Sequence, residues 1–525
     1  MTQTLSGRLD RVLHNVPRAY PGPGGAIAVL REGEVLVRHA WGWANAERRI
    51  AFTPRTLFRM CSITKQFTCG VLLDLFPDPS VLDSDVRRHL PRLEQSAPST
   101  LHLCHNQSGL RDYWAVAMLQ GAPAESAFGD SDAVRIIAGT QTVQFTPGSR
   151  YAYANQNFRI LSDILQECTG CCFAELLRAG IFDRLGMDTA FLAADTRAMP
   201  DGTEGYEGTY EGGFRAAENR ILWTGDAGLG ASLDDMIAWE RHIDATRDDP
   251  DALYSRLCAP VQFDDGNQAA YGFGLGRRNV LGRAVNAHGG ALRGWRSHRM
   301  FVPSERISVI VMFNHLSAAH EAATDLLAAV LGEERPPPAA AGPDPHWLGG
   351  YVEPETGLAV RIDVMPGAGL RLRYNHPAEH LDLQPDGSAR GDSVSLRPED
   401  DGLRMDRPDE NQSSRLRPCR GTAALDVAGR YRCDELESEL TIADAGGLLY
   451  GGCSGPLGQG RMELLEAVGP DLWTMPCPRA LDHTPPGDWT LAFQRDGTGT
   501  VSKVEVGCLL ARRLPYQRLG SSAGA

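Results

Sequence analysis

Lysine is almost absent from this chain. Lysine and arginine together number 52, and lysine occurs only at positions 65 and 503, so the other 50 basic residues are arginine. Arginine stays protonated in proteins, whereas a buried lysine changes its protonation state readily. A lysine that arginine has not replaced is therefore a candidate for proton chemistry, and chance survival of the codon is the alternative.

The sequence also lacks a basic excess, a long apolar run and a targeting segment. The formal net charge is −14, which argues against a nucleic-acid partner because phosphate binding needs a basic face. No stretch of about 18 apolar residues occurs, so no membrane span is expected. The first 20 residues are polar and contain no apolar run after a basic start, which favours a cytoplasmic protein.

Cysteine is not scarce, but its spacing carries little information. The chain has 12 cysteines, and without export they are expected to be reduced and mostly buried thiols. The pair Cys168 and Cys171 has C-x-x-C spacing, but no second such pair completes a zinc site. Neither a metal nor a cofactor is therefore predicted.

The length of 525 residues predicts two or three domains. The first two-thirds of the chain has mixed α and β patterns. Apolar periodicity predicts two strands around a turn over 26–37, helices over 67–75, 159–168, 234–243 and 318–331, and strands over 296–302 and 307–314.

A segment rich in proline and alanine, residues 332–345, is expected to be a linker. After it the pattern changes to short alternating stretches with frequent glycine. Tyr351 followed by Glu355 is echoed 80 positions later by Tyr431 followed by Glu435. The repeat predicts two similar all-β units, each a small antiparallel barrel.

Three short motifs carry the candidate chemistry, and the first is Ser62-Ile-Thr-Lys65. Residues three apart on a helix share a face, so the lysine amine is expected beside the serine hydroxyl. A serine hydroxyl needs a neighbouring base to act as a nucleophile. The alternative is a serine and a lysine exposed on one turn of a surface helix.

The other two motifs are Tyr153-Ala-Asn155 and His288-Gly289-Gly290. A tyrosine near a lysine ammonium is expected to lose its proton more easily, which would suit a proton relay. Glycines allow a backbone to approach a reacting group closely, and a strand edge there could offer an N–H to an oxyanion. Alone, each motif is more typical of a core tyrosine or a turn.

Together and in this order, the motifs resemble the S-x-x-K, Y-x-N and H-x-G motifs of the penicillin-recognising serine hydrolases, the β-lactamase or S12 peptidase family. Within that family the chain resembles the D-aminopeptidases most. The phrases NQSGLRDYW at 106–114 and HGGALRGW at 288–295 carry this resemblance, together with the two C-terminal β-units.

The resemblance implies an α+β fold. Residues 1–331 would form a β-lactamase-like catalytic domain with an antiparallel sheet flanked by helices, and 332–345 a linker. Residues 346–420 and 421–525 would form two lipocalin-like barrels of eight strands each.

The resemblance also implies roles for individual residues. Ser62 would attack the carbonyl of an N-terminal D-amino acid, while Lys65 and Tyr153 pass the proton to the leaving amine. The backbone N–H groups of Ser62 and Ala291 would form the oxyanion hole, and Asn155 would contact the substrate. Water would then hydrolyse the acyl-enzyme.

His288 and Gly289 replace the Lys-Thr/Ser pair that β-lactamases usually have. His288 exchanges a permanent charge for a titratable group, and Gly289 removes a hydroxyl that would bind a substrate carboxylate. Both changes weaken selection for a C-terminal carboxylate, which fits an enzyme that reads the amino end.

An aminopeptidase must also recognise a free α-ammonium. The resemblance assigns this to a specificity loop of the last barrel, residues 477–487, which begins with Cys477 and ends with Gly487. Asp482 is the carboxylate of this loop, and it would bind the ammonium. From the sequence alone, a solvated barrel turn is the alternative.

The expected partner is therefore a small peptide or amide with a free N-terminal D-residue, with β-lactams as candidate inhibitors and a homodimer as the assembly. Another hydrolase of the same fold is the nearest alternative: a D-amino-acid amidase, an esterase or a D-Ala-D-Ala carboxypeptidase. A non-catalytic penicillin-binding-like protein is the alternative of another class.

Overall fold

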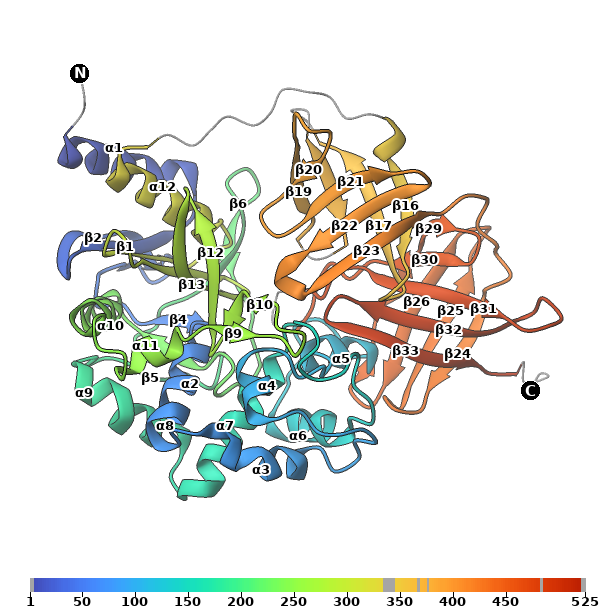
Figure 1. Cartoon of the computed structure of the whole chain (residues 1–525), viewed down its shortest axis with the longest axis horizontal. Helices are drawn as coiled ribbons and strands as arrows, with labels where there is room; N and C mark the ends of the chain where they lie inside the picture. Colours follow the sequence, from blue (N-terminus) through green and yellow to red (C-terminus); the bar gives the residue numbers. More distant parts are fainter. Residues whose placement is uncertain (1–3, 334–344, 366–368, 375–376, 482–484, 521–525) are drawn as a thin grey trace.

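The computed structural model of the chain describes residues 4–333, 345–365, 369–374, 377–481 and 485–520. Figure 1 shows a mixed helical and sheet part formed by the N-terminal residues and, beside it, two all-β units formed by the C-terminal residues. This arrangement confirms the predicted α+β fold class. The predicted linker falls mostly on 334–344, which lie outside the described residues.

One antiparallel sheet forms the centre of the N-terminal part. Its strands lie in the order β11 (Tyr271–Gly272), β12 (Leu275–Val280), β13 (Arg283–Leu292), β14 (Trp295–Val302), β15 (Ile307–Phe313), β1 (Gly24–Arg31), β2 (Glu34–Asn45) and β3 (Ile50–Ala51). The predicted hairpin is confirmed: Gly33 in its turn has a φ of 77°, which glycine adopts without a steric penalty.

Successive residues of β1 point to opposite faces of this sheet, and both faces are covered. Ile27 and Val29 pack with α1 (Leu5–Ala19) and α12 (Ala319–Leu331) in one core cluster. Ala28 belongs to a larger cluster shared with the remaining helices and the last all-β unit.

The remaining helices follow one another between β4 and β9. They are α2 (Thr64–Leu75), α3 (Asp83–His89), α4 (Thr100–Cys104), α5 (Tyr113–Leu119), α6 (Asp130–Gly139), α7 (Asn155–Thr169), α8 (Phe173–Leu177), α9 (Asp183–Leu185), α10 (Leu233–Thr246) and α11 (Leu253–Leu257). The helices expected over 67–75, 159–168, 234–243 and 318–331 are confirmed as parts of α2, α7, α10 and α12.

Three small sheets connect the helices to the central sheet. They are β4 (Phe58–Cys61) with β8 (Leu229–Ala231) and β5 (Phe191–Leu192), the hairpin of β6 (Tyr206–Thr209) and β7 (Gly213–Ala216), and the pair β9 (Val261–Gln262) and β10 (Gln268–Ala269).

The first all-β unit is a closed barrel. Its strands are β16 (Gly349–Glu353), β17 (Leu358–Val364), β18 (Leu370–Arg373), β19 (Glu379–Leu383), β20 (Ala389–Arg390), β21 (Ser395–Glu399), β22 (Gly402–Arg407) and β23 (Gln412–Pro418).

The second all-β unit is a longer sheet. Its strands are β24 (Gly429–Cys433), β25 (Ser438–Asp444), β26 (Leu449–Gly455), β27 (Gly458–Gln459), β28 (Glu463–Leu464), β29 (Glu466–Gly469), β30 (Leu472–Met475), β31 (Trp489–Arg495), β32 (Val501–Cys508) and β33 (Ala511–Arg518). Residues 463–469 pair first with β26 and then with β30, so one bent segment joins the two ends of the sheet.

The internal repeat is visible in the register of the two units. Gly349 faces Ile362 in the first unit, and Gly429 faces Ile442 in the second. The Tyr351 hydroxyl donates to the carbonyl four residues earlier, and the Tyr431 hydroxyl does the same. The expectation of two similar antiparallel units is therefore confirmed, and the first unit is the predicted eight-stranded barrel. The second unit differs from the prediction: its described residues form a sheet of ten strands, among them the short strands β27, β28 and β29, and not a closed barrel of eight.

No helix in the described ranges has both the length and the apolar character that crossing a bilayer requires. Seven of the 12 cysteines are buried, which fits the prediction of mostly buried thiols.

Candidate active site

Ser62 lies in the tight turn between β4 and α2. The preceding residue, Cys61, has a φ of 53°, a left-handed conformation that is rare outside glycine. The Lys65 N–H donates to the Ser62 carbonyl at 3.1 Å, so the first helical turn brings the two residues together. Cys61 and Ile63 are fully buried, while Ser62 stays partly exposed. The turn thus presents the serine hydroxyl from an otherwise buried segment.

The Lys65 side chain is completely buried and surrounded by oxygen atoms. Its Nζ donates to Ser62 Oγ at 3.2 Å, to Asn155 Oδ1 at 2.8 Å and to the Asp226 carbonyl at 2.6 Å. It also lies 4.8 Å from the centre of the Tyr153 ring. The structure therefore brings the residues of the first two motifs into direct contact.

Asp112 fixes the orientation of the Asn155 amide. One Asp112 oxygen, Oδ2, accepts from the Asn155 backbone N–H at 2.7 Å and from Nδ2 at 2.9 Å. The amide oxygen of Asn155 is thereby turned toward Lys65. The other oxygen, Oδ1, caps α5 by accepting from the Trp114 N–H at 3.0 Å.

The last all-β unit supports this aspartate directly. The Asp112 N–H donates to the Leu510 carbonyl at 2.9 Å, and Arg111 Nε donates to the Arg512 carbonyl at 2.8 Å. The Arg111 guanidinium, which is buried, also lies 3.4 Å from a Glu435 oxygen. A chain of hydrogen bonds therefore runs from Leu510, in the turn before β33, through Asp112 and Asn155 to Lys65.

Asp226 is held by its own set of donors. Tyr113 OH donates to Asp226 Oδ2 at 2.5 Å, and the Thr224 N–H donates to Oδ1 at 2.9 Å. The carboxylate is fully buried. Its fixed position aims the Asp226 backbone carbonyl at Lys65.

The acidity of Tyr153 differs from the expectation. Burial raises the pKa of the phenol well above its usual value, and a hydrogen bond with Ser62 opposes that rise only in part. The expectation that Lys65 makes this tyrosine easier to deprotonate is therefore wrong. Burial disfavours the phenolate more than the hydrogen bond with Ser62 favours it, so the pKa of Tyr153 lies above that of an exposed tyrosine.

The ring of His288 lies next to that of Tyr153, with 6.3 Å between the two ring centres. Nδ1 is 2.6 Å from the Gly289 carbonyl, which only accepts, so Nδ1 carries the hydrogen. Nε2 then accepts from Tyr271 OH at 3.0 Å. Burial, reinforced by Lys65, lowers the pKa of His288 to about 3. The ring is therefore neutral at physiological pH.

Strand β13 passes close to the turn that carries Ser62. A Cβ at Gly290 would lie 2.2 Å from the Met60 carbonyl oxygen and 2.3 Å from Ser297 Oγ. In the described chain, β12 pairs with β13 only as far as Ala287. The stretch that contains Ala291 therefore keeps one edge clear of strand pairing on the side of β4.

The specificity loop is attached to the catalytic part just beyond Ala291. The buried Arg293 donates from Nη2 to the Ala480 carbonyl at 2.5 Å. Glu125 accepts from both Arg293 and Arg479. Burial would raise the pKa of Glu125, but the hydrogen bonds and charges of the two arginines outweigh it and lower the pKa.

Asp482, the residue expected to bind the ammonium, lies outside the described residues. The loop residues on both sides are packed, since Ala480 and Leu481 are only 1% exposed and Pro485 to Gly487 are buried. Both ends of the loop are therefore packed against the protein, while Pro478 and Arg479 are exposed.

The sequence alone did not identify Asp112, Asp226, Tyr271 and Arg293 as site residues. Asp112 lies inside the phrase that resembles the family, but its role is visible only from its contact with Asn155. Arg293 lies likewise inside the phrase at 288–295, and no pattern marks Asp226 and Tyr271. Within the described residues, no three His, Cys, Asp or Glu side chains gather into a group that could hold a metal.

Gly290→Ala is expected to lower catalytic efficiency by roughly 100-fold, because displacing a reacting group by about 1 Å has an effect of that order. The matched control is Gly289→Ala, where the nearest atom to a new Cβ is 3.5 Å away. The measurement is kcat/KM on a D-alanine anilide, with circular dichroism as the check on folding. Equal activity of the two variants would show that the close approach of β13 is not required.

His288 should not titrate between pH 5 and 8. The pKa of His288 is about 3 in the folded protein, below the ordinary 6.5 expected in the unfolded chain. As the pH falls, the unfolded chain therefore binds a proton at His288 before the folded protein does. This residue therefore reduces stability as the pH falls from 6.5 toward 3. The measurement is the NMR shift of the ring Cε1–H, assigned by its loss in His288→Gln. A midpoint near 6.5 would contradict the neutral ring.

Family models divide the chain at the same place as the structure. A β-lactamase model matches residues 9–333, and a model described as D-aminopeptidase, domain B, matches 340–517. The chain is 59% identical to a D-aminopeptidase of Gluconobacter oxydans, over 99% of this chain and all of that one. It is 45% identical to a D-aminopeptidase of Brucella melitensis, over 97% and 98% of the two chains.

Solved structures share the fold at low identity. An octameric penicillin-binding protein homologue from Pyrococcus abyssi matches with a TM-score of 0.54 and 17% identity, over 97% of this chain and 99% of that one. A D-amino acid amidase from Ochrobactrum anthropi matches with a TM-score of 0.51 and 20% identity, over 62% and 99%. Given its two family models and its full-length relatives, this chain belongs to the β-lactamase family and, within it, to the D-aminopeptidases.

Proposed function

We propose that this protein is a serine aminopeptidase that removes N-terminal D-amino acids from small peptides, amides and esters through an acyl-enzyme on Ser62. The observation that carries the proposal is the buried contact of Lys65 with Ser62 Oγ at 3.2 Å. A buried amine beside a serine hydroxyl is the arrangement that nucleophilic attack requires. The full-length relatives named D-aminopeptidase support the substrate class.

Acylation needs three proton movements. Lys65, which donates three hydrogen bonds as an ammonium, must first lose one proton to solvent. As Ser62 Oγ then attacks the carbonyl carbon, its proton passes to the neutral Lys65 amine. Tyr153 gives its phenolic proton to the leaving nitrogen, which completes cleavage of the amide bond, and Lys65 returns a proton to Tyr153. The raised pKa of Tyr153 supports its part as the donor.

The oxyanion would accept hydrogen bonds from the backbone N–H groups of Ser62 and Ala291. The turn at Cys61 and the clear edge of β13 support this assignment, because both leave backbone groups beside the serine. A water molecule then attacks the acyl carbon, the same groups move its proton, and Ser62 is released with the D-amino acid.

The free α-ammonium of the substrate would bind Asp482. The hydrogen bond from Arg293 to Ala480 supports this proposal. Arg293 comes directly after the end of β13 and two positions after Ala291, so the loop is attached close to the proposed oxyanion hole. A loop attached there closes the site on the side of the acyl residue. Such a closed end admits one residue with a free amine and excludes longer chains.

His288 and Gly289 would leave the opposite end of the site open to neutral leaving groups. A neutral imidazole offers no charge to a C-terminal carboxylate. Gly289 has no side chain, and a Cβ built at this position would lie 3.5 Å from the nearest other atom. Both features support release of an amine, an alcohol or ammonia rather than selection of a C-terminal residue.

We further propose a cytoplasmic location and a homodimeric assembly. The exposed free thiols of Cys168, Cys171 and Cys172 suit a reducing compartment. The homodimer rests on the family resemblance, and light scattering coupled to size-exclusion chromatography tests it.

Lys65→Arg should be nearly as damaging as Ser62→Ala, which is expected to lower the rate by roughly four or more decades. Arginine keeps the positive charge but stays protonated, so it cannot accept the serine proton. The measurement is kcat/KM on a D-alanine anilide with folded variants. If Lys65→Arg kept most of the activity, the lysine would be an electrostatic anchor, and turnover by Ser62→Ala would end the proposal.

Asp482→Ala should lower catalytic efficiency on D-alanine amide by roughly one to two decades, because a charge-assisted hydrogen bond contributes about 1.5–3 kcal/mol. Deleting residues 478–486 should in addition raise activity on the N-acetyl analogue. The measurement compares both substrates in wild type, Asp482→Ala and the deletion. Unchanged ratios in all three proteins would show that the loop takes no part in specificity.

A further inference from the structure

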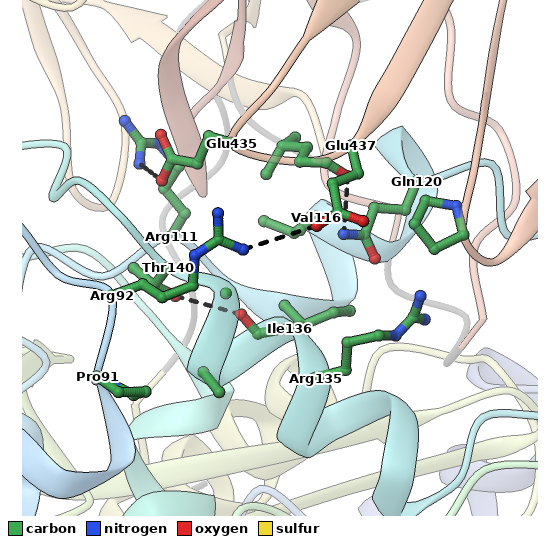
Figure 2. Close-up of a pocket in the computed structure, with 14 residues that line it drawn as sticks. Pro91, Arg92, Arg111, Val116, Gln120, Arg135, Ile136, Thr140, Glu435 and Glu437 are labelled. Atoms are coloured by element: carbon green, nitrogen blue, oxygen red, sulfur yellow. Dashed lines mark hydrogen bonds and ion pairs between the residues drawn. The ribbon is translucent and has the colours of Figure 1, made fainter.

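A pocket of about 290 Å³ lies between the catalytic part and the last all-β unit, and none of the candidate catalytic residues lines it. Figure 2 shows its wall of α5 and α6 residues facing the turn between β24 and β25. Ligand pockets in proteins have volumes of roughly 300–1,000 Å³. This pocket therefore has room for a molecule of about the size of an amino acid.

The floor of the pocket is apolar. Val116 from α5, Ile136 from α6 and Leu436 from the facing turn are each less than 10% exposed, and all three line it. Aliphatic groups of a ligand would bury apolar surface against them.

One polar atom in this apolar setting has no partner. Gln120 is only 7% exposed, and its Nε2 donates to the Leu436 carbonyl at 3.1 Å. Because a carbonyl only accepts, this bond fixes the amide orientation. The amide oxygen of Gln120 is then buried with no hydrogen-bond partner among the described residues. This oxygen has almost no accessible surface, so a ligand N–H would reach it only after a shift of the Gln120 side chain toward the pocket. Leaving it unpaired destabilises the protein.

Two arginines at the rim supply positive charge. The Arg92 and Arg135 side chains are 51% and 41% exposed, and both line the pocket (Figure 2). Their ion pairs are long, at 3.6 Å to Glu437 for Arg92 and 3.4 Å to Asp132 for Arg135. Each guanidinium has five N–H donors, so a ligand carboxylate can be bound without breaking these pairs.

Two carboxylates also line the pocket: Glu437, which pairs with Arg92 at 3.6 Å, and Glu435. Glu435 accepts from the N–H groups of Gln141 and Thr142 and from the Thr142 hydroxyl, and it pairs with the buried Arg111. Its negative charge is thus compensated within the protein. A ligand carboxylate would therefore bind at the rim through the N–H donors that Arg92 and Arg135 do not use toward Glu437 and Asp132.

We propose that this pocket binds a free apolar amino acid, with its carboxylate at the rim arginines Arg92 and Arg135 and its side chain on the apolar floor. Its amino group would bind the Gln120 oxygen after a shift of that side chain. The D configuration of that ligand rests on the proposed function, in which D-amino acids are the products. A bound ligand would join the two parts of the chain beside Arg111, the neighbour of Asp112. Occupancy would therefore stabilise the interface that supports the active site.

Isothermal titration calorimetry with D-leucine and L-leucine tests the proposal on the full chain. Free leucine has no bond to cleave, so the result does not depend on hydrolysis. The test variants are the double substitution Arg92→Ala and Arg135→Ala, and Gln120→Leu. The matched control is Arg88→Ala, an exposed arginine on α3 that is 59% exposed and outside the pocket. D-Leucinol, which lacks the carboxylate, is the ligand control.

The expected result is saturable binding to wild type and to Arg88→Ala. Binding should weaken roughly tenfold or more in the test variants and with D-leucinol. Leucine should also raise the unfolding temperature of wild type but not of the double variant. Equal binding by wild type and the double variant would place the ligand elsewhere and overturn the proposal, as would no saturable binding of either enantiomer to wild type. Preference for the D form alone would link the pocket to the proposed products, and lack of preference would remove that link.

Discussion

The burial of one amine, the Lys65 side chain, is the constraint on which the rest of the site depends. Water cannot solvate it, so the protein supplies three oxygen acceptors from three separate segments. Each acceptor needs support of its own: Asp112 turns the Asn155 amide, and Tyr113 and Thr224 hold Asp226. Of the three acceptors, Ser62 and Asn155 are partly exposed and Asp226 is fully buried, and Ser62 is the one that carries a hydroxyl suited to act as the proposed nucleophile.

The last all-β unit is part of this support rather than an appendage. It accepts the Asp112 N–H, pairs Glu435 with the buried Arg111 and attaches its loop to Arg293 near the end of β13. The hydrogen-bonded surroundings of Lys65 and the end of β13 therefore both depend on contacts with this unit. Removing it is expected to change the geometry of the candidate site.

The sequence predicts those parts of the structure that depend on local spacing. Helical periodicity places Lys65 beside Ser62, and the repeat at Tyr351 and Tyr431 predicts two related units. The supporting contacts are not predictable in this way, because they join segments 161 and 187 residues apart, as in Lys65 with Asp226 and Arg293 with Ala480. The acidity of Tyr153 was misjudged for a similar reason, since burial is a property of the folded chain.

The account is tested most directly by identifying the residue that carries the acyl group. A D-alanine ester is mixed with the enzyme, the reaction is quenched in acid during turnover, and the protein is digested for mass spectrometry. The account predicts a D-alanyl adduct on the peptide that contains Ser62, and on its side chain by fragmentation. Turnover with the adduct on any other residue would contradict it.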